Sequence, residues 1–223
     1  MVRRRFVVVG LGSFGYHVAR ALYERGQDVL AVDHHRLAVE AITPHCSRAR
    51  QADAADREAL EETGAGEADV AIVGLGTRID ASILATLFLK ELGVPEVVAK
   101  AVSRDHARIL QHIGATEVVQ PEREMAARLA QHMAEPDVLE RFPFLEGYAL
   151  VEIRAPRSLW GTPLSDSRLR REHRLSVVLL KRREGGREVA VPAQGDTEIR
   201  EGDILVVLAK GEDVDAFRRG RPG

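Results

Sequence analysis

Gly10-Leu11-Gly12-Ser13-Phe14-Gly15 lies between a β-branched run at 6–9 and a segment with helical spacing. Glycines in this pattern allow a tight turn, a close approach of the backbone to a phosphate, and close packing of a helix on a strand. The N-terminus of the following helix offers unpaired N–H groups and a positive dipole end for a pyrophosphate. The stretch predicts a nucleotide-binding loop; the alternative is a glycine turn needed only for packing.

An acidic residue follows at the spacing typical of a dinucleotide fold. Asp33 closes the second apolar run, 18 residues after Gly15, where its carboxylate can accept hydrogen bonds from ribose hydroxyls. Its negative charge disfavours a ligand that carries a 2′-phosphate, although Arg36 nearby weakens that preference. The alternative interpretation of Asp33 is a surface aspartate without a ligand.

Short apolar runs alternate with helical segments over the first 120 residues. Such alternation predicts a parallel sheet covered on both faces, because parallel strands are buried on both sides. About six strands are expected, which is the number in a doubly wound dinucleotide-type fold. The runs lie at 6–9, 29–32, 49–52 (the weakest), 70–73, 97–98 and 118–119.

The pattern changes after this sheet. A helix is expected at 125–133, followed by an apolar, proline-containing connector at 137–145 that has to pack on its own domain or on a partner subunit. From Tyr148 onward apolar residues tend to recur at every second position, which is typical of β-strands, and Gly185-Gly186 is a hairpin signal. The expected elements are strands at 148–153, 176–181, 188–191 and 204–208 and helices at 164–172 and 213–218.

The fold class predicted from these patterns is α/β: a Rossmann-type doubly wound parallel sheet followed by a small α+β C-terminal domain. The expected division is a nucleotide-binding domain at 1–135, a crossover connector at 136–146 and a C-terminal domain at 147–223.

Further candidate contacts lie where other strands of the sheet end, since this fold binds ligands at that edge. For each of them taken alone, an ordinary loop or surface charge is at least as good an interpretation as a ligand contact. They are Asp53 and Ala54 after the third strand, Gly76 and Thr77 after the fourth, Lys100 in the fifth and Glu122 after the sixth.

Composition excludes several classes of function. The 223 residues carry 32 Lys+Arg and 34 Asp+Glu, and this net charge of −2 gives no attraction to nucleic acid as a whole. Aromatic residues make up 4%, too few for a base-stacking platform. The single cysteine, Cys46, cannot form an intrachain disulfide, and no apolar run approaches the roughly 18 residues that span a bilayer. A cytoplasmic protein without nucleic-acid binding is expected.

The sequence also lacks recognisable catalytic motifs. There is no Walker lysine, nucleophile elbow, CxxC or HExxH, and no evident His–Asp or Tyr–Lys arrangement to move a proton beside a hydride transfer. A nucleotide site without chemistry is the better interpretation, and a small NAD-dependent oxidoreductase is the alternative.

Several motifs resemble the RCK (regulator of potassium conductance) domains, in particular the cytoplasmic regulatory subunits of bacterial Ktr/Trk potassium uptake systems. The similarity runs in order along nearly the whole chain. The segments that carry it are 8–15, 30–33, 51–54, 87–95, 113–115, 121–126 and 202–207.

This resemblance implies a site for ATP/ADP or NAD(H). Many ATP-binding members have a phosphate-contacting arginine where this chain has Ser13. ATP/ADP and NAD(H) are therefore almost equally expected as the ligand, with a slight preference for ATP/ADP. The implied roles are Gly10, Gly12 and Gly15, with Ser13 and Phe14, at the phosphates; Asp33 at the ribose; Asp53 and Ala54 at the adenosine; Gly76, Thr77 and Ile79 on the fourth-strand loop; Lys100 on the fifth strand; and Glu122 near the terminal phosphate and an associated divalent cation.

The resemblance also implies partners. Members of the family form homodimers that assemble into rings, typically octamers, and the ring docks at the inner face of the cell membrane on a potassium-translocating subunit. Some relatives bind cyclic di-AMP in the C-terminal domain at positions that align with Leu164, Arg170 and Pro192; a solvated basic surface is the alternative there. A stand-alone nucleotide sensor without a channel partner is a further alternative.

Overall fold

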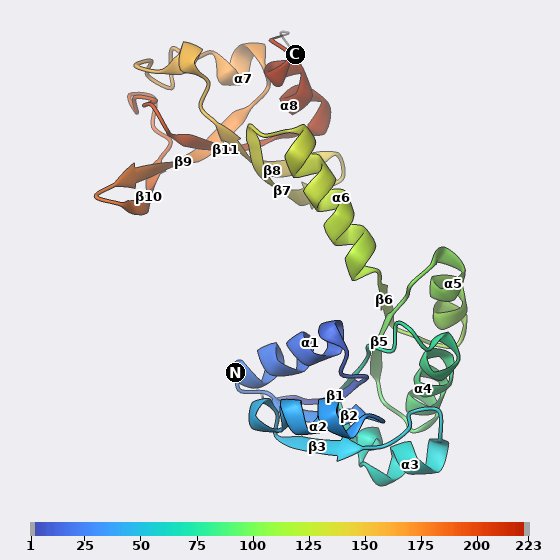
Figure 1. The fold of residues 1–223 in the computed structure, drawn as a ribbon. Helices are drawn as coiled ribbons and strands as arrows, with labels where there is room; N and C mark the ends of the chain where they lie inside the picture. The colour runs from blue at the N-terminus through green and yellow to red at the C-terminus, as the bar shows by residue number, and fades with distance from the viewer. Residues whose placement is uncertain (1–2, 221–223) are drawn as a thin grey trace. The chain divides into compact units, whose positions relative to one another are not determined.

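The computed structural model describes residues 3–220, which divide into two units after Glu124 (Figure 1). Each unit has its own sheet and its own hydrophobic core. Helix α6 (Pro121–Ala134) contains the boundary between them. Within residues 3–220, none of the helices combines the length and the apolar character needed to cross a membrane.

The N-terminal unit is built on a six-stranded parallel sheet in the order β3-β2-β1-β4-β5-β6. This order confirms the predicted doubly wound fold. The strands are β1 (Arg5–Val9), β2 (Asp28–Asp33), β3 (Arg48–Gln51), β4 (Val70–Val73), β5 (Glu96–Lys100) and β6 (Glu117–Val119). The helices are α1 (Ser13–Glu24), α2 (Arg36–Ile42), α3 (Arg57–Glu62), α4 (Ile79–Glu91) and α5 (Arg104–His112), with short 3-10 turns at Thr43–His45 and Ala65–Glu67.

Both faces of this sheet are buried, as successive side chains of a strand point to opposite sides. Val7 and Val9 of β1 pack with Leu89 of α4 in one cluster. Val8 packs on the other side with Ala19 of α1 in a second cluster. Because all six strands run parallel, their carboxyl ends share one edge of the sheet, and α1 begins beside it.

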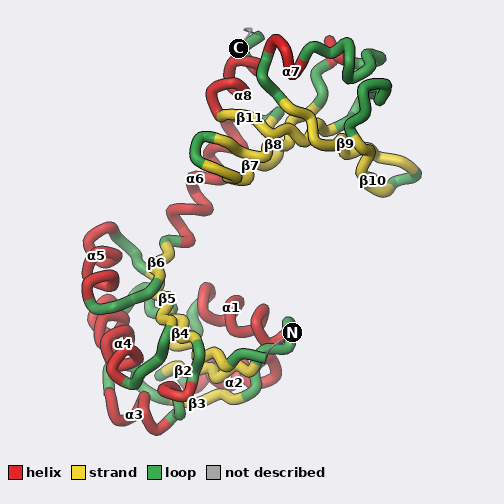
Figure 2. Tube along the Cα trace, turned by 180° about the vertical axis from the view of Figure 1, so that it is seen from behind, coloured by secondary structure: helices red, strands yellow, loops and turns green. Residues whose placement is uncertain are grey.

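The C-terminal unit is a five-stranded antiparallel sheet in the order β10-β9-β11-β8-β7, drawn in yellow in Figure 2. The Gly185-Gly186 turn joins β9 to β10, as expected. Its elements are β7 (Val138–Leu145), β8 (Tyr148–Arg154), a 3-10 turn at Arg157–Leu159, α7 (Leu169–Glu172), β9 (Ser176–Glu184), β10 (Arg187–Pro192), β11 (Ile204–Lys210) and α8 (Gly211–Arg218).

Two expected segments differ in the structure. The connector placed at 136–146 contains strand β7, which pairs with β8 at the edge of the second sheet; Pro143 is tolerated because an edge strand has unpaired N–H positions. The helix expected at 164–172 is reduced to α7, because Arg168 adopts a left-handed backbone with φ of 55°, which a right-handed helix cannot contain.

Candidate functional site

The glycine-rich loop joins β1 to α1, and its backbone is closely packed. Gly10 has φ of +89°, and its N–H donates to Val32 O at 2.8 Å. A Cβ on Gly15 would lie 1.8 Å from Gly10 O, so helix and strand approach too closely for any side chain there. Gly12 is different: it is exposed, and a Cβ there would meet no atom within 4 Å. Packing requires Gly15, whereas the open space at Gly12 suits the approach of a ligand to the start of α1.

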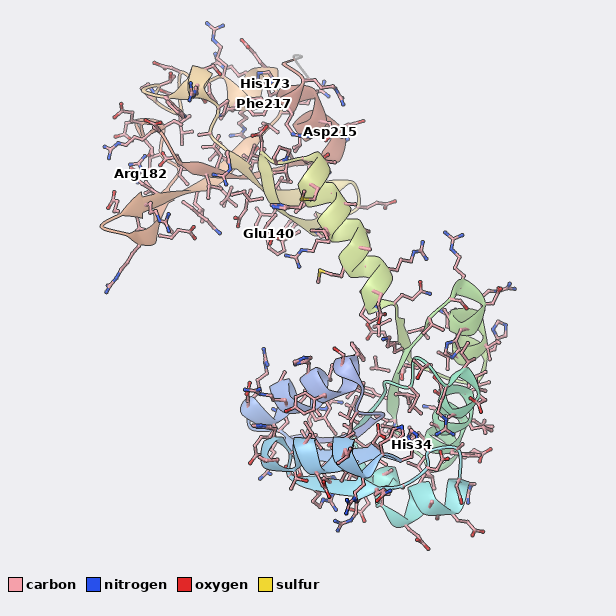
Figure 3. The ribbon with its side chains drawn as sticks, in the orientation of Figure 1. His34, Glu140, His173, Arg182, Asp215 and Phe217 are labelled. Atoms are coloured by element: carbon pink, nitrogen blue, oxygen red, sulfur yellow. The ribbon has the colours of Figure 1, made fainter. Side chains whose placement is uncertain are left out.

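Asp33, at the end of β2, is bound to the same loop. Its side chain is buried, Leu11 N–H donates to Oδ2 at 2.6 Å, and His35 N–H donates to Oδ1 at 2.8 Å. The ring of His34, labelled in Figure 3, places Nδ1 3.2 Å from Oδ1. Each carboxylate oxygen can accept a second hydrogen bond. Asp33 therefore fixes the loop and retains the capacity to accept bonds from a ribose.

A carboxylate–guanidinium pair lies at the ends of β3 and β4. Arg78 donates from Nη1 and Nη2 to the two oxygens of Asp53, both at 3.2 Å, and Ala55 N–H donates to Oδ1 at 3.0 Å. The Ala55 amide and then Arg78 hold the pKa of Asp53 below its ordinary value. Arg78 is absent from the predicted set, and its only sequence signal is its position after the Gly74–Thr77 loop. Ala54 beside the pair is buried.

Lys100 of β5 is a buried cation beside the glycine-rich loop. It is 9% exposed, its Nζ lies 5.6 Å from the centroid of the Phe14 ring, and it forms an ion pair with Glu122 of α6. Its hydrogen bond to Glu122 lowers the pKa of that carboxyl. A Cβ on Gly76 would lie 3.3 Å from Nζ, so Gly76 is close as well. The structure thus brings Phe14, Gly76, Lys100 and Glu122 together.

The remaining candidates of the N-terminal unit border this group. Ser13 is the exposed first residue of α1, Thr77 lies on the loop after β4, and Ile79 starts α4 and is 43% exposed. Glu122 also lines a cavity of about 430 Å³, together with Ala101, Val102, Ser103, Arg104, Gln120 and Arg123. The cavity supplies two further arginines next to the predicted phosphate end.

The metal prediction rests on Glu122 alone. Over the described range 3–220, no group of three or more His, Cys, Asp or Glu side chains is placed to hold a metal ion. The carboxylate of Glu122 is 70% exposed and engaged with Lys100. A cation there would need the oxygens of a bound phosphate to complete its ligands.

The C-terminal candidates lie around a basic cavity of about 400 Å³. Leu164 and Arg170 line it, and Pro192 immediately precedes the lining residue Ala193. Arg168 and Arg171 line it too, so three arginines gather here. Arg168 keeps its left-handed backbone at this cavity, a conformation that costs an L-residue about 1 kcal/mol.

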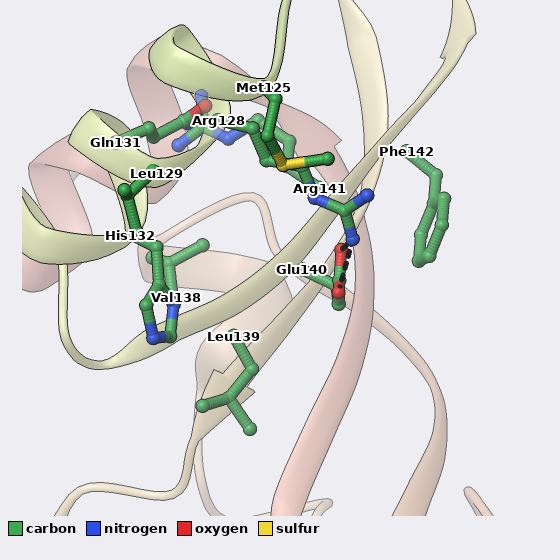
Figure 4. A pocket seen from close by; sticks show the side chains of 10 residues that line it. All are labelled: Met125, Arg128, Leu129, Gln131, His132, Val138, Leu139, Glu140, Arg141 and Phe142. Atoms are coloured by element: carbon green, nitrogen blue, oxygen red, sulfur yellow. Dashed lines mark hydrogen bonds and ion pairs between the residues drawn. The ribbon is translucent and has the colours of Figure 1, made fainter. Parts of the chain in front are cut away.

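An apolar surface covers the outer side of α6 and β7. Met125, Leu129 and Met133 of α6 are 60%, 58% and 73% exposed, and Phe142 and Phe144 of β7 are 48% and 63% exposed. A cavity of about 410 Å³ lies between the two elements (Figure 4), where Arg128 donates to both oxygens of Glu140 at 2.6 and 2.7 Å. Exposed apolar patches of this kind mark protein interaction surfaces.

Two family models match the chain. The TrkA-N domain matches residues 6–121, and the TrkA-C domain matches residues 148–219. Ktr system potassium uptake protein C of Bacillus subtilis is 37% identical over 218 residues, which cover 98% of this chain and 97% of that protein. Ktr system potassium uptake protein A of Vibrio alginolyticus is 36% identical over 205 residues and covers 92% of each chain.

Solved structures share the fold at lower identity. The GsuK channel superposes with a TM-score of 0.66 at 17% identity, covering 97% of this chain and 39% of the channel chain. The GsuK channel bound to NAD has a TM-score of 0.54 at 20% identity and covers 97% of this chain and 38% of that one.

Proposed function

The chain belongs to the TrkA/RCK family of regulatory subunits of Ktr and Trk potassium uptake systems, and we propose that it gates a membrane-embedded potassium-translocating subunit in response to a bound nucleotide. The observation that carries this proposal is the edge of the parallel sheet, where Gly12 leaves open space at the start of α1. Asp33 and Lys100 flank this opening with a carboxylate for a ribose and a cation for phosphates.

The ligand we favour is ATP/ADP, with NAD(H) as the alternative. Both share an adenosine and a pyrophosphate, which the glycine-rich loop and Asp33 suit equally. Structures of GsuK are described with NAD and with ADP. Glu122 stands at the phosphate end beside Arg104 and Arg123, where a divalent cation that accompanies ATP could be held between Glu122 and phosphate oxygens.

The assembly we propose is a homodimer that builds a ring, with eight chains as the favoured number. The apolar surface on α6 and β7 supports a contact between copies, since a monomer would leave this surface in water. The ring would act in the cytoplasm, at the inner face of the membrane, through its potassium-translocating partner.

We further propose that the chain binds nucleotide without converting it. The groups at the loop support this: Asp33 is engaged by two backbone amides, and Lys100 is paired with Glu122. Neither is placed as a free proton-transfer group beside a nicotinamide. Turnover of NADH by the purified protein would instead favour an oxidoreductase. If this chain is purified from its native cells and no potassium transporter accompanies it, a stand-alone nucleotide sensor would be favoured.

Replacing Lys100 with methionine tests the phosphate end of the site. We expect affinity for ATP and ADP to fall about tenfold, because a charge-assisted contact is lost while the buried stem is kept. Isothermal titration calorimetry measures the change. The matched control is Lys90→Met, which removes a lysine that bonds the carbonyls of Val94 and Pro95 at the end of α4. If Lys100→Met and Lys90→Met bind ATP and ADP with equal affinity, Lys100 does not contact the nucleotide.

The C-terminal cavity lined by Leu164 and Arg170 is our proposed site for cyclic di-AMP. Its three arginines suit a ligand with two phosphates. We expect Arg170→Gln to weaken cyclic di-AMP binding about tenfold in calorimetry, and Arg187→Gln, on the exposed β9–β10 hairpin, to leave it unchanged. Tight binding by both variants would speak for a solvated basic surface at this cavity.

A further inference from the structure

A separate cavity of about 630 Å³ lies in the C-terminal unit, with walls from β8, the 3-10 turn after it, and α8. It shares no lining residue with the cavity around Arg170. Its volume falls within the range of small-molecule sites. Its lining includes Arg154, Arg157, Trp160, His173, Phe217 and Arg218.

Aromatic side chains form one part of the wall. The rings of His173 and Phe217, labelled in Figure 3, meet edge to face with centroids 4.9 Å apart. The indole N–H of Trp160 donates to Ala155 O at 3.0 Å, which satisfies the polar edge of the ring. Flat ligands are held by such offset or edge contacts with aromatic rings.

Arginines form the other part of the wall. Arg154 and Arg157 are exposed, and neither has a carboxylate within ion-pair distance among residues 3–220. The guanidinium of Arg157 lies 5.6 Å from the Trp160 ring centroid, so one ligand can reach both groups. Asp137 is the single acidic residue in the lining, which leaves the cavity with a positive balance.

Two wall residues also carry a polar nitrogen that lacks a partner. Within the described part of the chain, His173 Nδ1 and Arg218 Nε are buried and make no hydrogen bond. Arg218 uses its Nη1 on Glu135, at 3.2 Å. Both nitrogens are closed off from solvent, so the polar groups that face the cavity are the exposed Arg154 and Arg157.

We propose that this cavity binds a small aromatic anion of the size of a nucleoside monophosphate. The ring stacks against Trp160 and Phe217. The phosphate lies between Arg154 and Arg157, where charge-assisted hydrogen bonds are strongest. This site is independent of the nucleotide site on the N-terminal sheet.

The chain offers a direct probe, because Trp160 is its one tryptophan. We expect AMP, added to the full-length protein, to change Trp160 fluorescence in a saturable way when the indole is excited at the red edge of its absorption, where AMP is transparent. Adenosine and ribose 5-phosphate each lack one half of the recognised group, and we expect both to bind at least about tenfold more weakly.

Variants separate this cavity from the nucleotide site. Arg154→Gln and Arg157→Gln are expected to shift the AMP midpoint about tenfold each, while Arg187→Gln leaves it unchanged. Asp33→Ala should also leave it unchanged, because Asp33 belongs to the other unit. The proposal is overturned if AMP produces no saturable change. It is equally overturned if the change disappears in Asp33→Ala and persists in Arg157→Gln.

Discussion

Replacing Asp33 with alanine is expected to lower nucleotide affinity at least about 100-fold. The carboxylate can accept hydrogen bonds from the two ribose hydroxyls, and two charge-assisted contacts of about 1.5 kcal/mol each correspond to that factor. The variant also loses the bonds from Leu11 N–H and His35 N–H that hold the glycine-rich loop in place. Calorimetry with ATP, ADP, NAD and NADH measures the loss. A thermal-shift titration should show no stabilisation of the variant by ligand.

The matched control is Asp28→Ala, at the opposite end of the same strand, where the carboxylate lies 3.9 Å from Arg3. That variant should bind nucleotide like the parent. The mass of the protein in solution should be unchanged in both variants, since neither residue belongs to the apolar surface on α6 and β7. Normal nucleotide binding by Asp33→Ala would refute the assigned role.

Replacing Gly15 with alanine is expected to destabilise the N-terminal unit by about 3 kcal/mol, the upper end of the usual overpacking cost, because a Cβ would lie 1.8 Å from Gly10 O. Cys46 reports on this change. Its thiol is buried beside Ala19 of α1, and burial raises its pKa. We expect a thiol reagent to label Cys46 markedly faster in the variant.

Gly12→Ala is the companion variant, since both changes add one methyl group to the same loop. Nothing lies within 4 Å of a Cβ at Gly12, so Cys46 labelling should stay slow while nucleotide affinity falls. The unfolding transition seen by Trp160 should be the same in both variants, because that residue lies in the C-terminal unit. Slow labelling of Gly15→Ala would mean that α1 is not held as closely as the structure indicates.

Much of the N-terminal fold could be predicted from local pattern. Buried parallel strands are nearly continuous apolar runs, and β1, β2 and β4 have that character. Strand β3 was the weakest prediction because it lies at the sheet edge with most of its residues exposed. The apolar segments do not reveal the order of the strands in the sheet, because that order depends on pairing between residues far apart in the sequence.

Strand β7 within the connector is not predictable from pattern, for a related reason. Phe142 and Phe144 of β7 are exposed and Pro143 interrupts the pattern, so the segment lacks the clean alternation of a half-buried strand. The pairing of β7 with β8 depends on the tertiary fold, and the spacing of apolar residues in the sequence does not reveal it. The apolar character of the segment leaves Phe142 and Phe144 exposed on the described chain.

The candidate site shows the same division between local and tertiary signals. Motif spacing identified Asp33, but it did not reveal that its carboxylate binds the amide of Leu11. Arg78 was missed because its partner, Asp53, lies 25 residues earlier on another strand end. Contacts between loops depend on strand order, so they emerge only once the sheet is assembled.

The central claim is that the bound nucleotide sets the activity of a potassium-translocating partner. A nucleotide can shift the assembly only if it binds two conformations with different affinities. The most direct measurement is potassium flux into vesicles that contain the membrane subunit and this chain, with saturating ATP, ADP, NAD or NADH. We predict that flux differs between nucleotides and that Asp33→Ala removes the difference. The same flux with every bound nucleotide, and with none, would contradict the account.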